Sequence, residues 1–173
     1  MAGMKGTKNV RNMLQSLAVV GVVVAAIYVF IPHDDTRTPP TAVDYRVELL
    51  QARRTAPYPV LAPEGLAKGD WVPTSRWYKD EKANAWHLGF HTTDGSQYVA
   101  VEQSTETPRK FIDRVSQSAE KTSKTEQIGG ETWTRYEGDT YDALVREDKG
   151  ATIVVTGSAS FARLTEMAKA LKA

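Results

Sequence analysis

The chain has 173 residues, which is enough for one domain and a short additional segment. Its 22 Lys and Arg residues balance 21 Asp and Glu residues, and the formal net charge of +1 predicts no basic surface for nucleic acid. The chain contains no cysteine, which excludes disulfides, thiolate metal sites, cysteine nucleophiles and a lipid anchor attached to cysteine.

An uncharged, strongly apolar segment covers residues 13–31. A helix of this length is about 28 Å long, which matches the hydrocarbon thickness of a bilayer. Lys5, Lys8 and Arg11 precede the segment, with no acidic residue among them. Because cytoplasmic flanks carry an excess of cations, we predict a signal-anchor helix with a cytoplasmic basic segment at residues 1–12. The chain would then be a single-pass protein of the cell membrane with its C-terminal part outside the cytoplasm.

Two other interpretations of this segment remain open. Val24-Ala25-Ala26 is similar to the small-residue cleavage site of a secretory signal peptide, which would also export the domain. A buried core helix is the other interpretation. The apolar run continues as far as Ile31, and this length favours the uncleaved anchor.

A linker and a short helix are predicted after the anchor. Residues 32–43 contain three prolines and little apolar content, which is typical of an extended linker. Residues 44–54 are predicted to be helical, because Val43, Val47 and Leu50 follow helical spacing.

The next segment, residues 56–66, cannot continue the helix, because it has three prolines within its first eight residues. We predict an extended strap over the core. The strap would contribute three apolar side chains to that core, Tyr58, Val60 and Leu61.

Three segments with strand-forming residues follow, at residues 72–78, 86–92 and 97–103. Asp94-Gly95 is typical of a tight turn and predicts a hairpin of the last two strands. Side chains alternate between the two faces of a strand. We therefore expect one buried face with Trp86, Leu88 and Phe90, and one exposed or half-buried face with His87, Gly89 and His91.

The second half of the domain repeats the order of helix and strands. Thr107-Pro108 is a favourable helix start, and this helix is predicted to end near residue 119. Residues 116–127 are polar and predict a mobile loop. Three more strands are expected at residues 131–137, 140–146 and 151–156, followed by a final helix that starts at Ser158 or Ser160.

Short turns between neighbouring strands predict antiparallel pairing. We therefore expect an α+β fold, in which residues 44–173 form an extracytoplasmic antiparallel β-sheet domain with helices on one face of the sheet.

The residue types that usually carry chemistry are sparse. Four residues along a strand span about 13 Å, so His87 and His91 lie too far apart to share a metal ion. The sequence Gly157-Ser158-Ala159-Ser160 lacks the second glycine of a nucleophile elbow. We predict no catalytic residue, no metal site and no cofactor, and we expect a protein that is not an enzyme.

Aromatic residues are the remaining candidates for a site. All four tryptophans lie outside the apolar segment, and Trp77 is adjacent to Tyr78, so the two point to opposite faces. Aromatic side chains dominate binding surfaces as well as cores. We predict that Trp77, His87 and His91 form a binding face on the open side of the sheet.

Several longer segments resemble the actinobacterial family known as domain of unknown function 4245. They are Val43–Arg46, Ala52–Arg54, Ala56–Pro63, Trp86–Phe90, Tyr98–Ser104, Gly130 with Trp133, Ala143–Arg146 and Val154–Ser160. The resemblance implies a single-pass actinobacterial membrane protein with an exported domain, and it implies no catalytic residue. Residues 65–71 depart from the family pattern, which leaves the path of the strap uncertain there.

Two functions follow as hypotheses. The first is a membrane-anchored extracytoplasmic binding or accessory module of the envelope, which contacts a membrane protein or an envelope component. The alternative is a carrier or sensor of a small ligand, with an aromatic pocket between the sheet and the helices. The expected contact with lipid is made by residues 13–31.

Overall fold

The computed structural model describes residues 6–30, 39–67, 69–79 and 83–173. The chain divides into two units, residues Met1–Thr36 and Arg37–Ala173. The start of the predicted cytoplasmic segment and the greater part of the predicted linker lie outside the described residues.

The first unit contains helix α1 (Gly6–Phe30), which includes residues 13–30 of the predicted anchor. Within it, the 19 residues Val10–Tyr28 are long and apolar enough to cross a membrane. None of this stretch is buried, which distinguishes it from the core helix of a globular domain.

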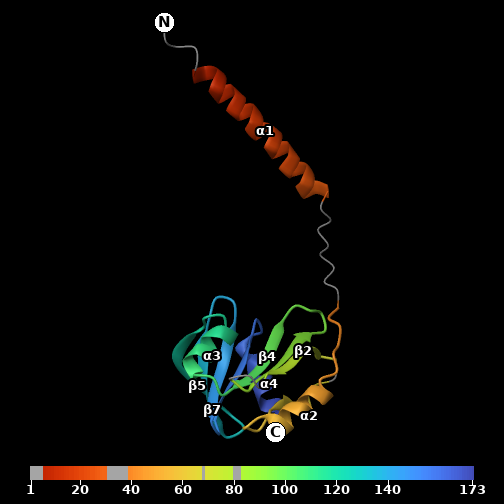
Figure 1. The fold of residues 1–173 in the computed structure, drawn as a ribbon, viewed down its shortest axis with the longest axis vertical. Coiled ribbons are helices and arrows are strands. Elements are labelled where there is room, and N and C mark those ends of the chain that lie inside the picture. The colour runs from red at the N-terminus through yellow and green to blue at the C-terminus, as the bar shows by residue number, and fades with distance from the viewer. Residues whose placement is uncertain (1–5, 31–38, 68, 80–82) are drawn as a thin grey trace. The chain divides into compact units, whose positions relative to one another are not determined.

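The second unit is built on a seven-stranded antiparallel sheet within the described residues, in the order β2-β3-β4-β8-β7-β6-β5 (Figure 1). The α+β class is thereby confirmed. The strands are β2 (Trp71–Lys79), β3 (Ala85–Thr92), β4 (Tyr98–Ser104), β5 (Glu120–Ile128), β6 (Glu131–Glu137), β7 (Asp142–Asp148) and β8 (Ala151–Gly157). Strands β4 and β8 pair in the centre and join an N-terminal three-stranded meander to a C-terminal four-stranded one.

Tight turns connect β3 to β4, as predicted, and also β7 to β8. Gly95 has a φ of 68° in the β3–β4 turn, and the Asp94 carboxylate accepts a hydrogen bond from the backbone N–H of Ser96 at 2.9 Å. Lys149 and Gly150, with φ of 49° and 80°, connect β7 to β8. Turns of this hand match the twist of the strands that they join.

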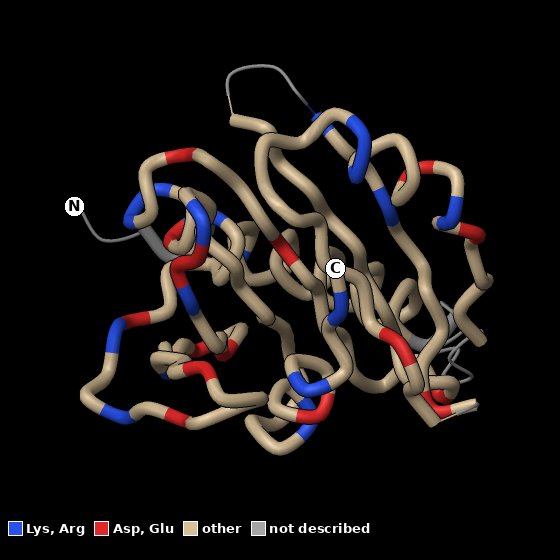
Figure 2. The backbone as a smooth tube through the Cα atoms, turned by 90° about the horizontal axis from the view of Figure 1, so that it is seen from below, with Lys and Arg blue, Asp and Glu red and all other residues tan. Residues whose placement is uncertain are grey.

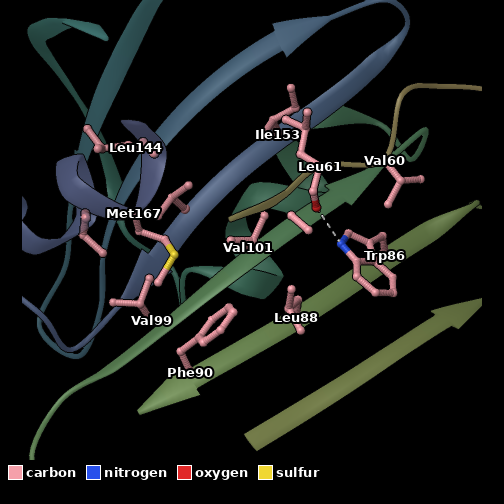
Figure 3. Packing of buried hydrophobic residues seen from close by; sticks show 14 of the residues in the cluster. Val60, Leu61, Trp86, Leu88, Phe90, Val99, Val101, Leu144, Ile153 and Met167 are labelled. Carbon is pink, nitrogen blue, oxygen red and sulfur yellow. Dashed lines mark hydrogen bonds between the residues drawn. The ribbon is translucent and has the colours of Figure 1, made fainter. Parts of the chain in front are cut away.

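One face of the sheet carries the larger of two apolar clusters formed by the described residues. Helix α2 (Arg46–Thr55), the strap and helix α4 (Phe161–Ala170) cover this face (Figures 1 and 3). The sheet contributes Trp86, Leu88, Phe90, Val99, Val101, Leu144, Ile153 and Val155 to it. The expected buried face of residues 86–92 is therefore confirmed.

The opposite face carries helix α3 (Pro108–Val115), which is shorter than predicted. Phe111 and Ile112 of α3 pack on Ala143, Val145 and Val154. Leu144 belongs to the cluster that α2, the strap and α4 cover, whereas its two neighbours in sequence pack with α3, so helices lie on both faces. The prediction that the helices cover a single face was therefore wrong.

The strap is buried as predicted, and two side chains of the sheet hold its backbone. The Gln103 amide accepts a hydrogen bond from the Leu61 N–H at 2.6 Å and donates one to the Pro59 carbonyl at 3.1 Å. Trp86 Nε1 donates to the Leu61 carbonyl at 3.1 Å (Figure 3). Farther along, β1 (Ala62–Pro63) pairs with β9 (Leu171–Lys172), which ties the strap to the C-terminal end of the described chain.

The predicted short helix is present as α2, and the residues that it buries are not Val47 and Leu50. Val47 and Leu50 are 73% and 55% exposed, whereas Ala52 is fully buried and Leu49 packs on the same cluster. Tyr45 fixes this rotation of the helix, because its ring meets the edge of the Phe90 ring at a centroid distance of 6.2 Å.

The prediction of a loop at residues 116–127 was also wrong, because β5 lies there as an edge strand. Most of its side chains are exposed, and Ile128 is its one buried residue. An edge strand that buries so little carries no apolar alternation, and its many charges protect the edge from pairing with another chain. Over the whole domain, Lys and Arg are interspersed with Asp and Glu along the backbone (Figure 2).

The hydrogen bonds of Gln103 give a first prediction. Gln103→Ala removes both bonds to the strap and leaves the buried Leu61 N–H and the Pro59 carbonyl without these partners. We expect the free energy of unfolding to fall by about 2–4 kcal/mol, measured by urea denaturation of the full chain in detergent micelles. Gln127→Ala on the exposed edge strand is the matched control and should change stability by less than about 0.5 kcal/mol. Equal losses in the two variants would contradict the role of Gln103.

Candidate functional site

A hollow of about 410 Å³ lies on the α3 face of the sheet. The strands β2, β3 and β4 form its floor, and the C-terminal end of α3 forms one side. The three predicted binding residues, Trp77, His87 and His91, all line this hollow. The described residues thus bring together side chains that the sequence placed on two strands.

His87 is the centre of a hydrogen-bonded row across three strands. Its Nδ1 lies 2.6 Å from Glu102 Oε1, and its Nε2 lies 2.8 Å from Ser75 Oγ. An ionised carboxylate only accepts, so Nδ1 carries the proton toward Glu102 and, in the neutral ring, Nε2 accepts from the serine. His87 is buried, whereas we expected an exposed or half-buried position.

Trp77 covers this row. Its indole stacks on the His87 ring with a centroid distance of 5.2 Å and an interplanar angle of 8°. Lys79 Nζ lies 5.1 Å from the centroid of the same indole, which is a cation–π contact. The neighbouring residue Tyr78 packs on the other face of the sheet, as the alternation predicted.

His91 belongs to a second, aromatic row. Its Nδ1 lies 2.9 Å from Thr74 Oγ1, and its ring lies 4.9 Å from that of Tyr98. The Tyr98 ring in turn lies 5.9 Å from Tyr141. Burial raises the pKa of the Tyr98 phenol to about 12, so its hydroxyl is protonated at neutral pH and can donate a hydrogen bond.

Sequence reasoning missed Glu102, Tyr98 and Tyr141. The hairpin register pairs His87 with Glu102 and His91 with Tyr98. Counting outward from the Asp94-Gly95 turn would have found both partners, because directly opposite residues share a face. Tyr141 lies beyond β4 and β8, and no local signal places it beside Tyr98.

The connection of Ser75, His87 and Glu102 matches the order of a hydroxyl–imidazole–carboxylate relay. His87 and Glu102 line the hollow, but Ser75 does not. A molecule in the hollow would therefore meet the carboxylate and the aromatic rings before it met the hydroxyl. This geometry favours binding over attack by the serine.

A buried oxygen without a described partner distinguishes this hollow from a larger one. The larger one, of about 650 Å³, lies between α3 and strands β5 to β7 and is lined in part by Arg109 and Tyr136. Among the described residues, Glu102 Oε2 is a buried polar atom without a hydrogen-bond partner, and none of the residues that line the larger hollow has such an atom. The described residues hold no group of three or more His, Cys, Asp or Glu placed to bind a metal ion.

The chain matches the family described as "Protein of unknown function (DUF4245)" over residues 5–171. The chain belongs to this family. The DUF4245 match includes α1, the strap and every residue of the hollow. No curated protein matches the chain.

A solved structure, that of MucB in complex with MucA(peri), is similar to part of the chain. The match has a TM-score of 0.36 and 13% sequence identity, and it covers 65% of this chain and 35% of the MucB chain. The chain thus spans about a third of the length of that protein.

Gly89 provides a prediction for the floor of the hollow. A Cβ at this position would lie against Ser75 Oγ and 2.7 Å from the Tyr98 hydroxyl oxygen. Gly89→Ala should therefore displace both side chains and lower the free energy of unfolding by about 1–3 kcal/mol. Urea denaturation measures the loss.

The variant Ser75→Ala supplies the control for Gly89→Ala. Because it removes the nearest clashing atom, the double variant should lose less stability than the two single variants added together. Strict additivity would show that the serine and the glycine do not meet as described.

Proposed function

We propose that the chain is a membrane-anchored extracytoplasmic binding module, without catalytic activity of its own, whose binding surface is the hollow on the α3 face. One observation carries the proposal. Trp77, His87 and His91 converge in a concave surface that also holds a buried carboxylate, Glu102. Concave, aromatic-lined sites with a few convergent polar groups are typical of ligand binding.

The size and position of the hollow favour a small ligand, or a protruding group of a larger partner, as its occupant. Its volume of about 410 Å³ falls within the range of small-molecule sites. It lies between the sheet and the end of α3, which supports the hypothesis of an aromatic pocket between sheet and helix. An accessory module would present the same hollow to a component of the envelope.

The membrane anchor is supported by α1 and by the charges around it. The apolar stretch Val10–Tyr28 has the length of a bilayer span. Lys5 and Lys8 precede this stretch, and Arg11 is its second residue. This excess of cations at the N-terminal end supports a cytoplasmic N-terminus and an exported domain.

The topology can be tested with single cysteines, because the chain contains none. We expect a membrane-impermeant thiol reagent to label Ser123→Cys in intact cells and to leave Thr7→Cys unlabelled. Ser123 is exposed on β5, so its accessibility depends on the membrane and not on burial. After the cells are permeabilised, both positions should react. Labelling of Thr7→Cys in intact cells would overturn the proposed orientation.

Occupancy of the hollow can be tested with a photoreactive amino acid. We expect benzoylphenylalanine in place of Tyr141, which lines the hollow, to form an adduct in intact cells, detected as a mass increase of the purified full chain. The matched control replaces Lys169, which is exposed on α4 at the other face of the sheet.

Removal of the indole by Trp77→Ala should weaken the adduct at position 141. No adduct at position 141, or equal adducts at both positions, would contradict binding in the hollow.

A further inference from the structure

Glu102 is a buried carboxylate that the fold satisfies only in part. Its side chain is 8% exposed, and Oε1 is engaged by His87 Nδ1 at 2.6 Å. Among the described residues, Oε2 has no hydrogen-bond partner, and the residue lines the hollow. A buried carboxylate oxygen without a donor is destabilising, so a donor supplied by an occupant would stabilise the site.

The described cations around the hollow are engaged elsewhere. Arg114 lines the hollow, but its guanidinium donates to Glu106 Oε2 at 2.8 Å. Lys79 lies over the Trp77 ring. On the other face of β2, Arg76 pairs with Glu48 at 3.1 Å. Glu102 Oε2 thus has no hydrogen-bond partner among the described residues, and no described Lys or Arg side chain is paired with this carboxylate.

Aromatic rings surround the same space. Tyr98 and Tyr141 lie next to each other, and His91 and Trp77 also line the hollow. The faces of tyrosine and indole rings are negative and attract a positive charge, an effect that grows where water is excluded. Rings and carboxylate therefore favour the same kind of group.

We propose that Glu102 binds a protonated amine of the occupant, with an ammonium N–H donating to Oε2. This inference rests on the proposed function, that the hollow is a binding site. An ammonium supplies both what the carboxylate lacks, a donor, and what the carboxylate and the rings attract, a positive charge. A hydroxyl supplies the donor without the charge and binds more weakly. The amine belongs to a free soluble molecule or to a lipid headgroup.

The test compares two probes that differ in that group, benzylamine and benzyl alcohol. The full chain is kept in dodecylmaltoside micelles, and the four tryptophan indole N–H resonances are followed by NMR, with Trp77 assigned by Trp77→Phe. We expect benzylamine to shift the Trp77 signal saturably, with a dissociation constant about tenfold or more below that of benzyl alcohol. Trp86 and Trp133, buried in the cluster on the strap face, should not shift.

The variant Glu102→Gln removes the charge and keeps an acceptor for His87. It should weaken benzylamine binding about tenfold or more and leave benzyl alcohol binding nearly unchanged. Glu64→Gln removes one negative charge from an exposed position away from the hollow and should change neither. If Glu102→Gln does not fold, the comparison of the two probes on the unaltered chain still tests whether the hollow prefers an ammonium to a hydroxyl.

The outcomes separate this inference from the proposed function. If benzyl alcohol binds as tightly as benzylamine, or more tightly, the proposal of an ammonium contact is overturned, and the hollow remains a binding site. If neither probe shifts the Trp77 signal but an adduct forms at position 141 in cells, the ammonium proposal is likewise overturned and the hollow remains a binding site. If neither probe shifts the Trp77 signal and no adduct forms at position 141, the proposal that the hollow is a binding site is itself overturned.

A second arm identifies the source of the amine. Glycerophosphoethanolamine carries the ammonium of a lipid headgroup beside a phosphodiester, and cadaverine carries a free amine without one. Tighter binding of the first assigns the site to a headgroup, and tighter binding of the second assigns it to a soluble amine. If either compound displaces benzylamine, the result supports the proposed ammonium contact. If neither compound displaces it, the proposed contact is overturned.

Discussion

The hydrogen bonds that Gln103 and Trp86 make to the strap are the constraint on which the rest of the domain depends. The prolines of the strap exclude a helix and remove backbone donors, so the strap cannot satisfy its own polar groups when it is buried. An amide from β4 and an indole from β3 supply the missing partners. The strap can then close the apolar face of the sheet together with α2 and α4, and the site is left to the other face.

The strand alternation that builds this core also builds the hollow. Gln103 points to the strap and its neighbour Glu102 points to the hollow, just as Trp86 and His87 diverge on the adjacent strand. A slip of one residue in the β3–β4 register would exchange both pairs, burying the imidazole and the carboxylate in the apolar core. The Asp94-Gly95 turn fixes the register, so a short local signal controls the core and the site together.

The difference between local signals and contacts between distant elements explains what the sequence could predict. Tight turns, prolines and apolar alternation are local signals. The turns predicted the antiparallel sheet, the prolines predicted the strap, and the alternation predicted the shared face of His87 and His91. The charged edge strand β5 buries almost nothing and left no pattern to find. The rotation of α2 and the placement of α3 depend on contacts between elements distant in sequence, such as that of Tyr45 with Phe90. Tyr141 entered the site through the pairing of β4 with β8, which joins two separate meanders.

The row of Ser75, His87 and Glu102 is a costly way to fill a sheet face. Apolar residues of similar size would stabilise such a position as well or better, because charged groups lose hydration on burial. The cost is larger where one carboxylate oxygen has no donor among the described residues. Trp77 increases this cost of burial, because its indole covers the imidazole and keeps water from that side. A fold that needed only stability would gain by replacing the row, and its position in a hollow with aromatic walls is consistent with a group held ready for a ligand.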